Sequence, residues 1–264
     1  MRIVSLCPSL TELVFDLGAG DALVGRTKFC VQPRHLVDRV EAVGGTKNPK
    51  IDRIVALAPD LVLMNEEENR VEDAEALRAA GVACHTSMPR DVPGTARVVR
   101  SIGSALGRTE RAEEIARDIE ARSARVRATA ERAARVPYAY LIWRKPYMTV
   151  SADTYVSALL AEAGGENVFG ARPERYPEIT PDELRDAAPR MLLLSSEPFP
   201  FKQSHIDELV AVTGIAPERF RLVDGELLSW HGPRTALGVE YARAVLVGDR
   251  KEIGNRKQEI GKRK

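Results

Sequence analysis

TERAEEIARDIEARSARVRATAERAAR, residues 109–135, is the stretch around which the rest of the chain is organised. It contains no Gly or Pro and consists mostly of Ala, Glu and Arg, which are strong helix formers. Its apolar residues recur at steps of three and four, which places one narrow stripe on a helix face. The stripe consists of Ala112, Ile115, Ala116, Ile119, Val126, Ala130 and Ala133. We predict a rigid helix, roughly 40 Å long at about 1.5 Å per residue, that lies across two lobes. A surface helix within one domain is the alternative.

Short apolar runs alternate with helical segments on both sides of this stretch. Strands are predicted at residues 3–6, 23–25, 61–64, 83–86, 138–143, 191–194 and 221–223. Helices are predicted at residues 9–17, 51–58, 71–80, 95–106, 154–163, 181–187, 206–212 and 233–247. The spacing of Ser9 and Glu12 predicts a capping box at the first of these helices. This alternation is typical of a parallel sheet covered by helices. We therefore expect an α/β fold with two lobes, each a small parallel sheet flanked by helices, joined by one long rigid helix. The predicted division is 1–107, a connecting helix at 108–136, and 137–248.

One phrase occurs in both halves of the chain. Residues 52–63 read DRIVALAPDLVL, and residues 182–193 read DELRDAAPRMLL. In each, a helix opens near an Asp, a Pro follows seven residues later, and a buried strand comes next. This placement favours two lobes of like construction.

Charge is unevenly distributed along the chain. The net charge is +1, but residues 249–264 carry +4, so residues 1–248 are mildly acidic and do not resemble a nucleic-acid groove. The segments KEIGNRK and QEIGKRK nearly repeat each other at the end of the chain. We expect residues 249–264 to form a basic, disordered tail, with contact to a membrane or nucleic acid as the alternative.

Motifs of enzymes and of metal-binding proteins are missing from this sequence. It contains no GxGxxG after a strand, no Walker loop, no GxSxG and no HExxH. Its three cysteines form no CxxC pair, so no zinc site is predicted. MRIVSL at the start already has a strand pattern and lacks the features of a signal peptide. No run of apolar residues is long enough to span a membrane. We expect a non-enzymatic protein.

Ligands of open α/β sheets lie beyond the carboxyl ends of the strands. Aromatic residues are few in this chain, yet both tryptophans and several others fall at such places: Phe29, Trp143, Tyr147, Phe199, Phe201 and Trp230. Side chains of this kind can wall a large, flat, partly apolar ligand. The same set of loops contains Cys7, Pro8, Ser9 and Asn65. Two alternatives stay open, because Trp143 could end a strand in the core and Trp230 could plug a loop.

His231 is the one histidine among these loop residues, next to Trp230. An imidazole there could ligate a metal centre carried by the ligand, although the protein itself is not expected to hold a metal. A polar loop histidine without a ligand is the alternative.

Four segments resemble the cobalamin- and iron-siderophore-binding proteins of ABC importers, a class also called helical-backbone metal receptors. Residues 6–12 (LCPSLTE) are similar to the first strand–helix turn of that class, and residues 54–62 (IVALAPDLV) to its I-x-A-L-x-P-D-L-V segment. Residues 164–169 (GGENVF) match its GGEN[VI]F motif, and residues 230–234 (WHGPR) resemble its final cleft loop. The resemblance extends over about residues 2–247.

The resemblance implies a protein that captures a metal chelate between its lobes and delivers it to an ABC permease. A corrinoid is the first expectation for the ligand, followed by a ferric siderophore or haem, with no covalent cofactor. The family pattern places Pro8, Trp143, Tyr147, Trp230 and Arg234 in the cleft. With the loop residues above, the predicted ligand-binding set is Cys7, Pro8, Ser9, Phe29, Asn65, Trp143, Tyr147, Phe199, Trp230, His231 and Arg234.

Family members meet the permease through one acidic residue per lobe, and the matching positions here are predicted to be Glu72 and Glu208. The family is extracytoplasmic, or periplasmic. Because the chain begins with a strand pattern, a cytoplasmic protein of the same fold that binds, senses or handles a chelate is the alternative. A scaffold protein with a vestigial cleft is a further alternative.

Overall fold

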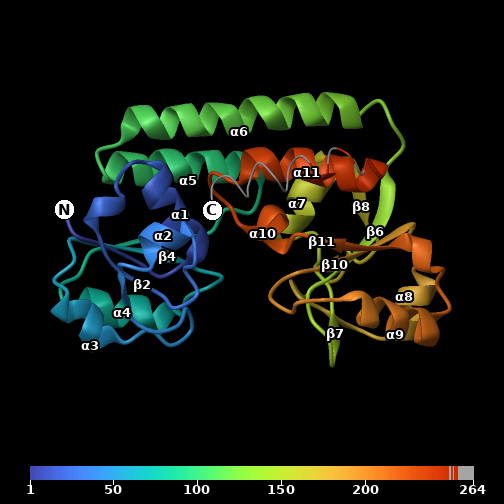
Figure 1. The fold of residues 1–264 in the computed structure, drawn as a ribbon, viewed down its shortest axis with the longest axis horizontal. Coiled ribbons are helices and arrows are strands. Elements are labelled where there is room, and N and C mark those ends of the chain that lie inside the picture. Colours follow the sequence, from blue (N-terminus) through green and yellow to red (C-terminus); the bar gives the residue numbers. More distant parts are fainter. Residues whose placement is uncertain (250, 252, 255–264) are drawn as a thin grey trace.

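The computed structural model describes residues 1–249, 251, 253 and 254, which form two lobes side by side (Figure 1). The first lobe contains a five-stranded parallel sheet in the order β3-β2-β1-β4-β5. Its strands are β1 Ile3–Ser5, β2 Leu23–Arg26, β3 Glu41–Ala42, β4 Leu61–Asn65 and β5 Cys84–Ser87. Its helices are α1 Pro8–Asp16, α2 Arg34–Val37, α3 Ile51–Ala56, α4 Val71–Ala79 and α5 Val92–Ala105, with a 3-10 turn at Gly20–Ala22.

The second lobe contains a four-stranded parallel sheet in the order β11-β10-β6-β8. Its strands are β6 Val136–Leu141, β8 Gly165–Asn167, β10 Met191–Ser195 and β11 Phe220–Val223, and β7 Tyr147–Met148 pairs antiparallel with β9 Glu178–Ile179. Its helices are α7 Tyr155–Glu162, α8 Pro181–Asp186, α9 Gln203–Thr213, α10 Gly225–Ser229 and α11 Thr235–Val247, with a 3-10 turn at Pro217–Arg219. The predicted fold class is confirmed. The limits at residues 107, 136 and 248 stay predictions.

Helix α6, Thr109–Ala130, connects the two sheets and lies along α5 and α11 (Figure 1). The predicted stripe is buried from Ala112 to Ala130, whereas Ala133 is exposed. The helix ends at Ala130 rather than Arg135, because the chain must leave it to enter β6 at Val136. Small side chains suit this stripe: a Cβ on Gly103 of α5 would lie 2.1 Å from the Cβ of Ala112, so α5 and α6 are in very close contact.

Ion pairs connect α6 to a helix of each lobe. Arg100 of α5 pairs with Glu113 and Glu120 of α6, and Arg122 of α6 pairs with Glu240 of α11. Because most of these side chains are partly exposed, each pair contributes little energy. These ion pairs instead fix the orientation of α6 relative to both lobes.

The repeated phrase has the same conformation in both lobes. In each, a short helix (α3 or α8) ends, a Pro follows, and a central strand (β4 or β10) begins. The residue before the Pro has a left-handed backbone in both cases, with φ of 45° at Ala58 and 46° at Ala188. A positive φ is unusual for Ala, so its presence at both positions indicates equivalent turns. The prediction of two like units is confirmed here in structural detail.

Two predictions concern the end of the chain and membrane-spanning segments. The predicted basic tail, residues 249–264, falls largely outside the described residues. Among the helices of the described part of the chain, none is both long enough and apolar enough to cross a membrane.

Candidate ligand-binding site between the lobes

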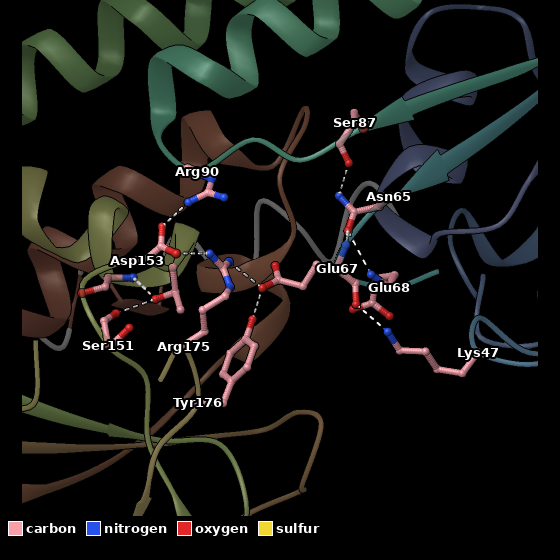
Figure 2. A network of polar contacts seen from close by, with 12 residues as sticks. Lys47, Asn65, Glu67, Glu68, Ser87, Arg90, Ser151, Asp153, Arg175 and Tyr176 are labelled. Carbon is pink, nitrogen blue, oxygen red and sulfur yellow. Dashed lines mark hydrogen bonds and ion pairs between the residues drawn. The ribbon is translucent and has the colours of Figure 1, made fainter. Parts of the chain in front are cut away.

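Loops of the two lobes meet at the boundary between the lobes, which is called the gap below. Glu67, in the loop after β4, contacts Arg175 and Tyr176, which lie between β8 and β9 of the other lobe (Figure 2). The carboxyl ends of the strands in an open α/β sheet are the usual place for a ligand. The gap is therefore the candidate site.

Asn65 shapes the first-lobe side of this gap. Its side chain is 2% exposed, and its Nδ2 donates to the carbonyl of Ser87 at 2.9 Å. Its Oδ1 accepts from the backbone N–H groups of Glu67 and Glu68 at 3.0 and 3.1 Å. Such a turn fixes the loop backbone through one side chain. Asn65 therefore positions the backbone of Glu67, and the ligand contact predicted for Asn65 stays a prediction.

An aromatic wall, consisting of Trp143, Phe199, Phe201 and His205, lies on the second lobe. The Trp143 and Phe199 rings meet edge to face with centroids 5.8 Å apart, and Phe199 and Phe201 do so at 4.9 Å. His205 packs against both phenylalanines. Phe201 is buried, Phe199 is half-buried, and Trp143 is 41% exposed. The wall thus extends from the core to solvent and ends in an indole that is accessible to a ligand.

Tyr147 lies next to this wall in β7. Its hydroxyl donates to Oε1 of Glu208 at 2.7 Å, and Arg144 donates to both carboxylate oxygens of Glu208. The hydrogen bonds from Arg144 and Tyr147 lower the pKa of Glu208 to about 2. Glu208 therefore has partners within its own lobe, while Glu72 is exposed in the first turn of α4. A role of either residue in docking stays a prediction.

A buried seam, consisting of Cys7, Ser9 and His231, joins the two lobes. The Oγ of Ser9 lies 3.3 Å from Sγ of Cys7 and 3.4 Å from Nε2 of His231. Burial lowers the pKa of His231 to about 4 and raises that of Cys7 to about 12. His231 is 8% exposed and its ring meets Tyr155 edge to face. The contact between Ser9 and His231 therefore crosses between the lobes, and the predicted ligand roles of the three residues stay predictions.

Arg234 is 1% exposed and forms a buried ion triad with two glutamates. Its Nε donates to Glu12 of α1 at 2.6 Å, and its Nη1 donates to Glu226 of α10 at 2.7 Å. Its guanidinium lies 4.6 Å from the ring centroid of Trp230, a cation–π contact. Trp230 is itself buried. Arg234 therefore connects the two lobes through Glu12, and the predicted cleft roles of Arg234 and Trp230 stay predictions.

One prediction about α1, which involves Glu12, is wrong. The predicted capping box of Ser9 and Glu12 does not form. The helix begins at Pro8 with Cys7 as its N-cap, and no side chain caps it. A carboxylate needed by a buried guanidinium is not available to cap a helix, because desolvation of an unpaired Arg costs far more than a missing cap.

Phe29 and Pro8 complete the predicted set. Phe29 is 50% exposed, with Nζ of Lys28 5.0 Å from its ring centroid. Pro8 is half-buried at the first turn of α1. The predicted residues thus separate into a buried group and a group that is at least partly accessible. The accessible group consists of Pro8, Phe29, Trp143, Tyr147 and Phe199.

Glu67, Arg175 and Tyr176 were not among the predicted residues. The acidic run at 66–68 follows a predicted strand, but 170–177 is an irregular segment in which no spacing marks Arg175. Only the juxtaposition of the two lobes brings these residues together.

Two pockets lie outside the gap, and both are lined by the first lobe alone. One of about 470 Å³ lies over residues 85–101, and one of about 290 Å³ over residues 64–86. Within the described ranges, no three His, Cys, Asp or Glu residues lie close enough together to hold a metal ion.

Known proteins share both the sequence pattern and the fold. A vitamin B12-binding protein of Vibrio campbellii is 27% identical over 194 residues, 74% of this chain and 70% of that protein. That of Vibrio vulnificus strain CMCP6 is 22% identical over 239 residues, 90% and 87% of the two chains.

Solved structures of periplasmic binding proteins have a similar fold. The periplasmic vitamin B12 binding protein BtuF of Vibrio cholerae has a TM-score of 0.81 at 23% identity, covering 95% of this chain and 98% of that one. The periplasmic heme-binding protein RhuT of Roseiflexus sp. RS-1 has a TM-score of 0.80 at 26% identity, with coverages of 93% and 96%. The model of the periplasmic binding protein family matches residues 3–213. The chain therefore belongs to the periplasmic binding protein family.

Proposed function

We propose that this protein is an extracytoplasmic substrate-binding protein that holds a metal chelate between its lobes and delivers it to an ABC permease. Family membership supports a binding role rather than catalysis. The names of its relatives favour a tetrapyrrole-like ligand, because they are described as binding vitamin B12 or haem. A corrinoid or haem is accordingly the first ligand to test, and a ferric siderophore the next.

The observation that carries this proposal is the aromatic wall. An exposed indole backed by two phenylalanines is costly to leave in water unless a ligand covers it. Phe29, on the other lobe, presents a second exposed ring. Flat, largely apolar macrocycles with a few polar groups match such a surface, because rings gain both buried area and offset stacking.

Trp143→Ala is expected to weaken chelate binding by about 1–3 kcal/mol, the range for truncating an aromatic anchor. Saturable quenching of tryptophan fluorescence by cyanocobalamin, haemin or a ferric siderophore measures affinity in the unaltered protein, and a visible-absorbance titration measures it in the variant. Leu222→Ala is the matched control, since Leu222 is an exposed apolar residue of the same lobe. Equal affinity of the two variants would remove the wall from the binding site.

Docking to a permease would use Glu72 and Glu208, and the two acids call for different substitutions. Glu72→Lys is expected to leave chelate affinity unchanged and to reduce chelate-stimulated ATPase activity of the cognate transporter in liposomes, since rim charges orient a complex. Glu208→Gln is used on the second lobe, because charge reversal there would disturb Arg144 and Tyr147 beside the wall. Normal stimulation by the double variant would exclude these residues from docking.

A further inference from the structure

A polar bridge crosses the gap between the lobes. Oε1 of Glu67 accepts from Nη2 of Arg175 at 2.7 Å and also from the hydroxyl of Tyr176 (Figure 2). Glu67 belongs to the first lobe, whereas both donors belong to the second. A guanidinium and a phenol therefore converge on one anionic oxygen in the candidate ligand-binding gap.

Arg175 is held in place by partners other than Glu67. Nη1 of Arg175 donates to Asp153 at 2.8 Å, and Asp153 also accepts from Arg90 at 2.6 Å (Figure 2). The backbone carbonyl of Arg175 accepts from the N–H of Ser151 at 2.9 Å. Because Asp153 binds a different nitrogen of the guanidinium, Nη2 stays directed at the gap when Glu67 moves away. Arg175 is thus preorganised by Asp153, which Arg90 of the first lobe also binds, and its guanidinium lies 5.9 Å from the ring centroid of the adjacent Tyr176.

The backbone of Glu67 is held in place by side chains of its own lobe. Nζ of Lys47 donates to its backbone carbonyl at 2.6 Å, and Asn65 accepts from its N–H. Its side chain is 28% exposed and that of Arg175 is 25% exposed, so the pair is half-buried and open to exchange with a solute. A half-buried, charge-assisted hydrogen bond such as that between Glu67 and Arg175 forms in the absence of a ligand, and an anion in solution can displace it.

We propose that Arg175 and Tyr176 form a subsite for an anionic oxygen of the ligand, a carboxylate or a phosphate, and that Glu67 is a built-in competitor which occupies this subsite when no ligand is bound. The inference rests on the proposed function and names the chemistry of the ligand. A chelate with a peripheral carboxylate or phosphate replaces the Glu67 carboxylate on the same donors. A neutral chelate must break the bridge without replacing it and therefore binds more weakly.

The bridge divides the protein molecules into those whose subsite is occupied by Glu67 and those whose subsite is open to a ligand. The apparent affinity of a ligand is its intrinsic affinity multiplied by the fraction of molecules whose subsite is open. Neutralising Glu67 weakens the bridge and raises that fraction, so affinity for an anionic ligand increases. Removing Arg175 has the opposite effect, because the ligand anion then loses its main partner.

The first test compares haemin, which has two carboxylates, with its dimethyl ester. Glu67→Gln is expected to raise haemin affinity about tenfold, while Arg175→Met lowers it about tenfold and abolishes the preference of the protein for haemin over the ester. Glu66→Gln is the matched control, since it removes the same charge from an exposed neighbour outside the bridge. Equal effects of Glu67→Gln and Glu66→Gln, or equal binding of acid and ester by the unaltered protein, would overturn the proposal.

The second test needs no chelate and separates this inference from the proposed function. Inorganic phosphate and acetate are titrated into 15N-labelled protein, and the Nε–H signal of Arg175 is assigned by its loss in Arg175→Met. Phosphate or acetate should shift the signal saturably in Glu67→Gln, with about tenfold more anion needed in the unaltered protein. A response no larger than that to chloride at equal ionic strength would refute the subsite, even if a chelate binds. A saturable response without chelate binding would support the subsite and refute the proposed chelate.

Discussion

Arg234→Met is expected to lower the free energy of unfolding by about 3–5 kcal/mol, the scale for removing one partner of a buried ion pair. The guanidinium is almost fully buried and bonded to Glu12 and Glu226. Met fills much of the same volume but removes the cation that the buried Glu12 carboxylate and Glu226 share. The loss is therefore mainly the desolvation cost of the carboxylates that the guanidinium no longer offsets.

Urea unfolding followed by circular dichroism measures this change. Arg122→Met is the matched control, because Arg122 also binds two acids but its side chain is 22% exposed, against 2% for Arg234. It is expected to cost about 1 kcal/mol or less. Adding Glu12→Gln to Arg234→Met should recover part of the loss, since a neutral amide is less costly to bury than a carboxylate. If Arg234→Met costs no more than Arg122→Met, the triad does not stabilise the lobe contact.

The regular elements could be predicted because periodicity along one chain segment reports burial of that segment. The stripe of α6, the central strands β4 and β10, and the equivalent turns at Ala58 and Ala188 all follow from local patterns. Short elements such as α2, β3 and the pair β7–β9 were missed, because two to four residues give no period to read.

The site was harder to predict because it depends on contacts between distant segments. Glu12 has the spacing of a capping residue, and only the position of α11 makes it a partner of Arg234. Trp143 and Trp230 are alike in sequence terms, yet one is accessible and the other is buried against a guanidinium. Which loop residue faces a ligand is decided by how the lobes are placed, and no single segment encodes that.

His231 should make the protein sensitive to acid. Burial holds the pKa of its imidazole at about 4, below the ordinary value of 6.5. Between these two values the unfolded chain binds a proton that the folded protein does not, so the free energy of unfolding falls as the pH falls. Above pH 6.5 the contribution is fully present. By pH 4 about 3 kcal/mol is lost, because each tenfold difference in proton affinity between the folded and unfolded chain corresponds to about 1.36 kcal/mol.

His231→Gln keeps a polar group near Ser9 but cannot titrate, so its stability should fall less than that of the unaltered protein between pH 6.5 and pH 4. Burial also raises the pKa of Glu197 to about 7, and that contribution is lost as the pH rises through 7. The two slopes oppose each other, so the difference between the variant and the unaltered protein isolates His231. His35→Gln, at an exposed position of α2, should keep the unaltered pH dependence. Urea unfolding at half-unit pH steps measures all three proteins, and parallel curves for them would show that His231 is solvated in the folded protein.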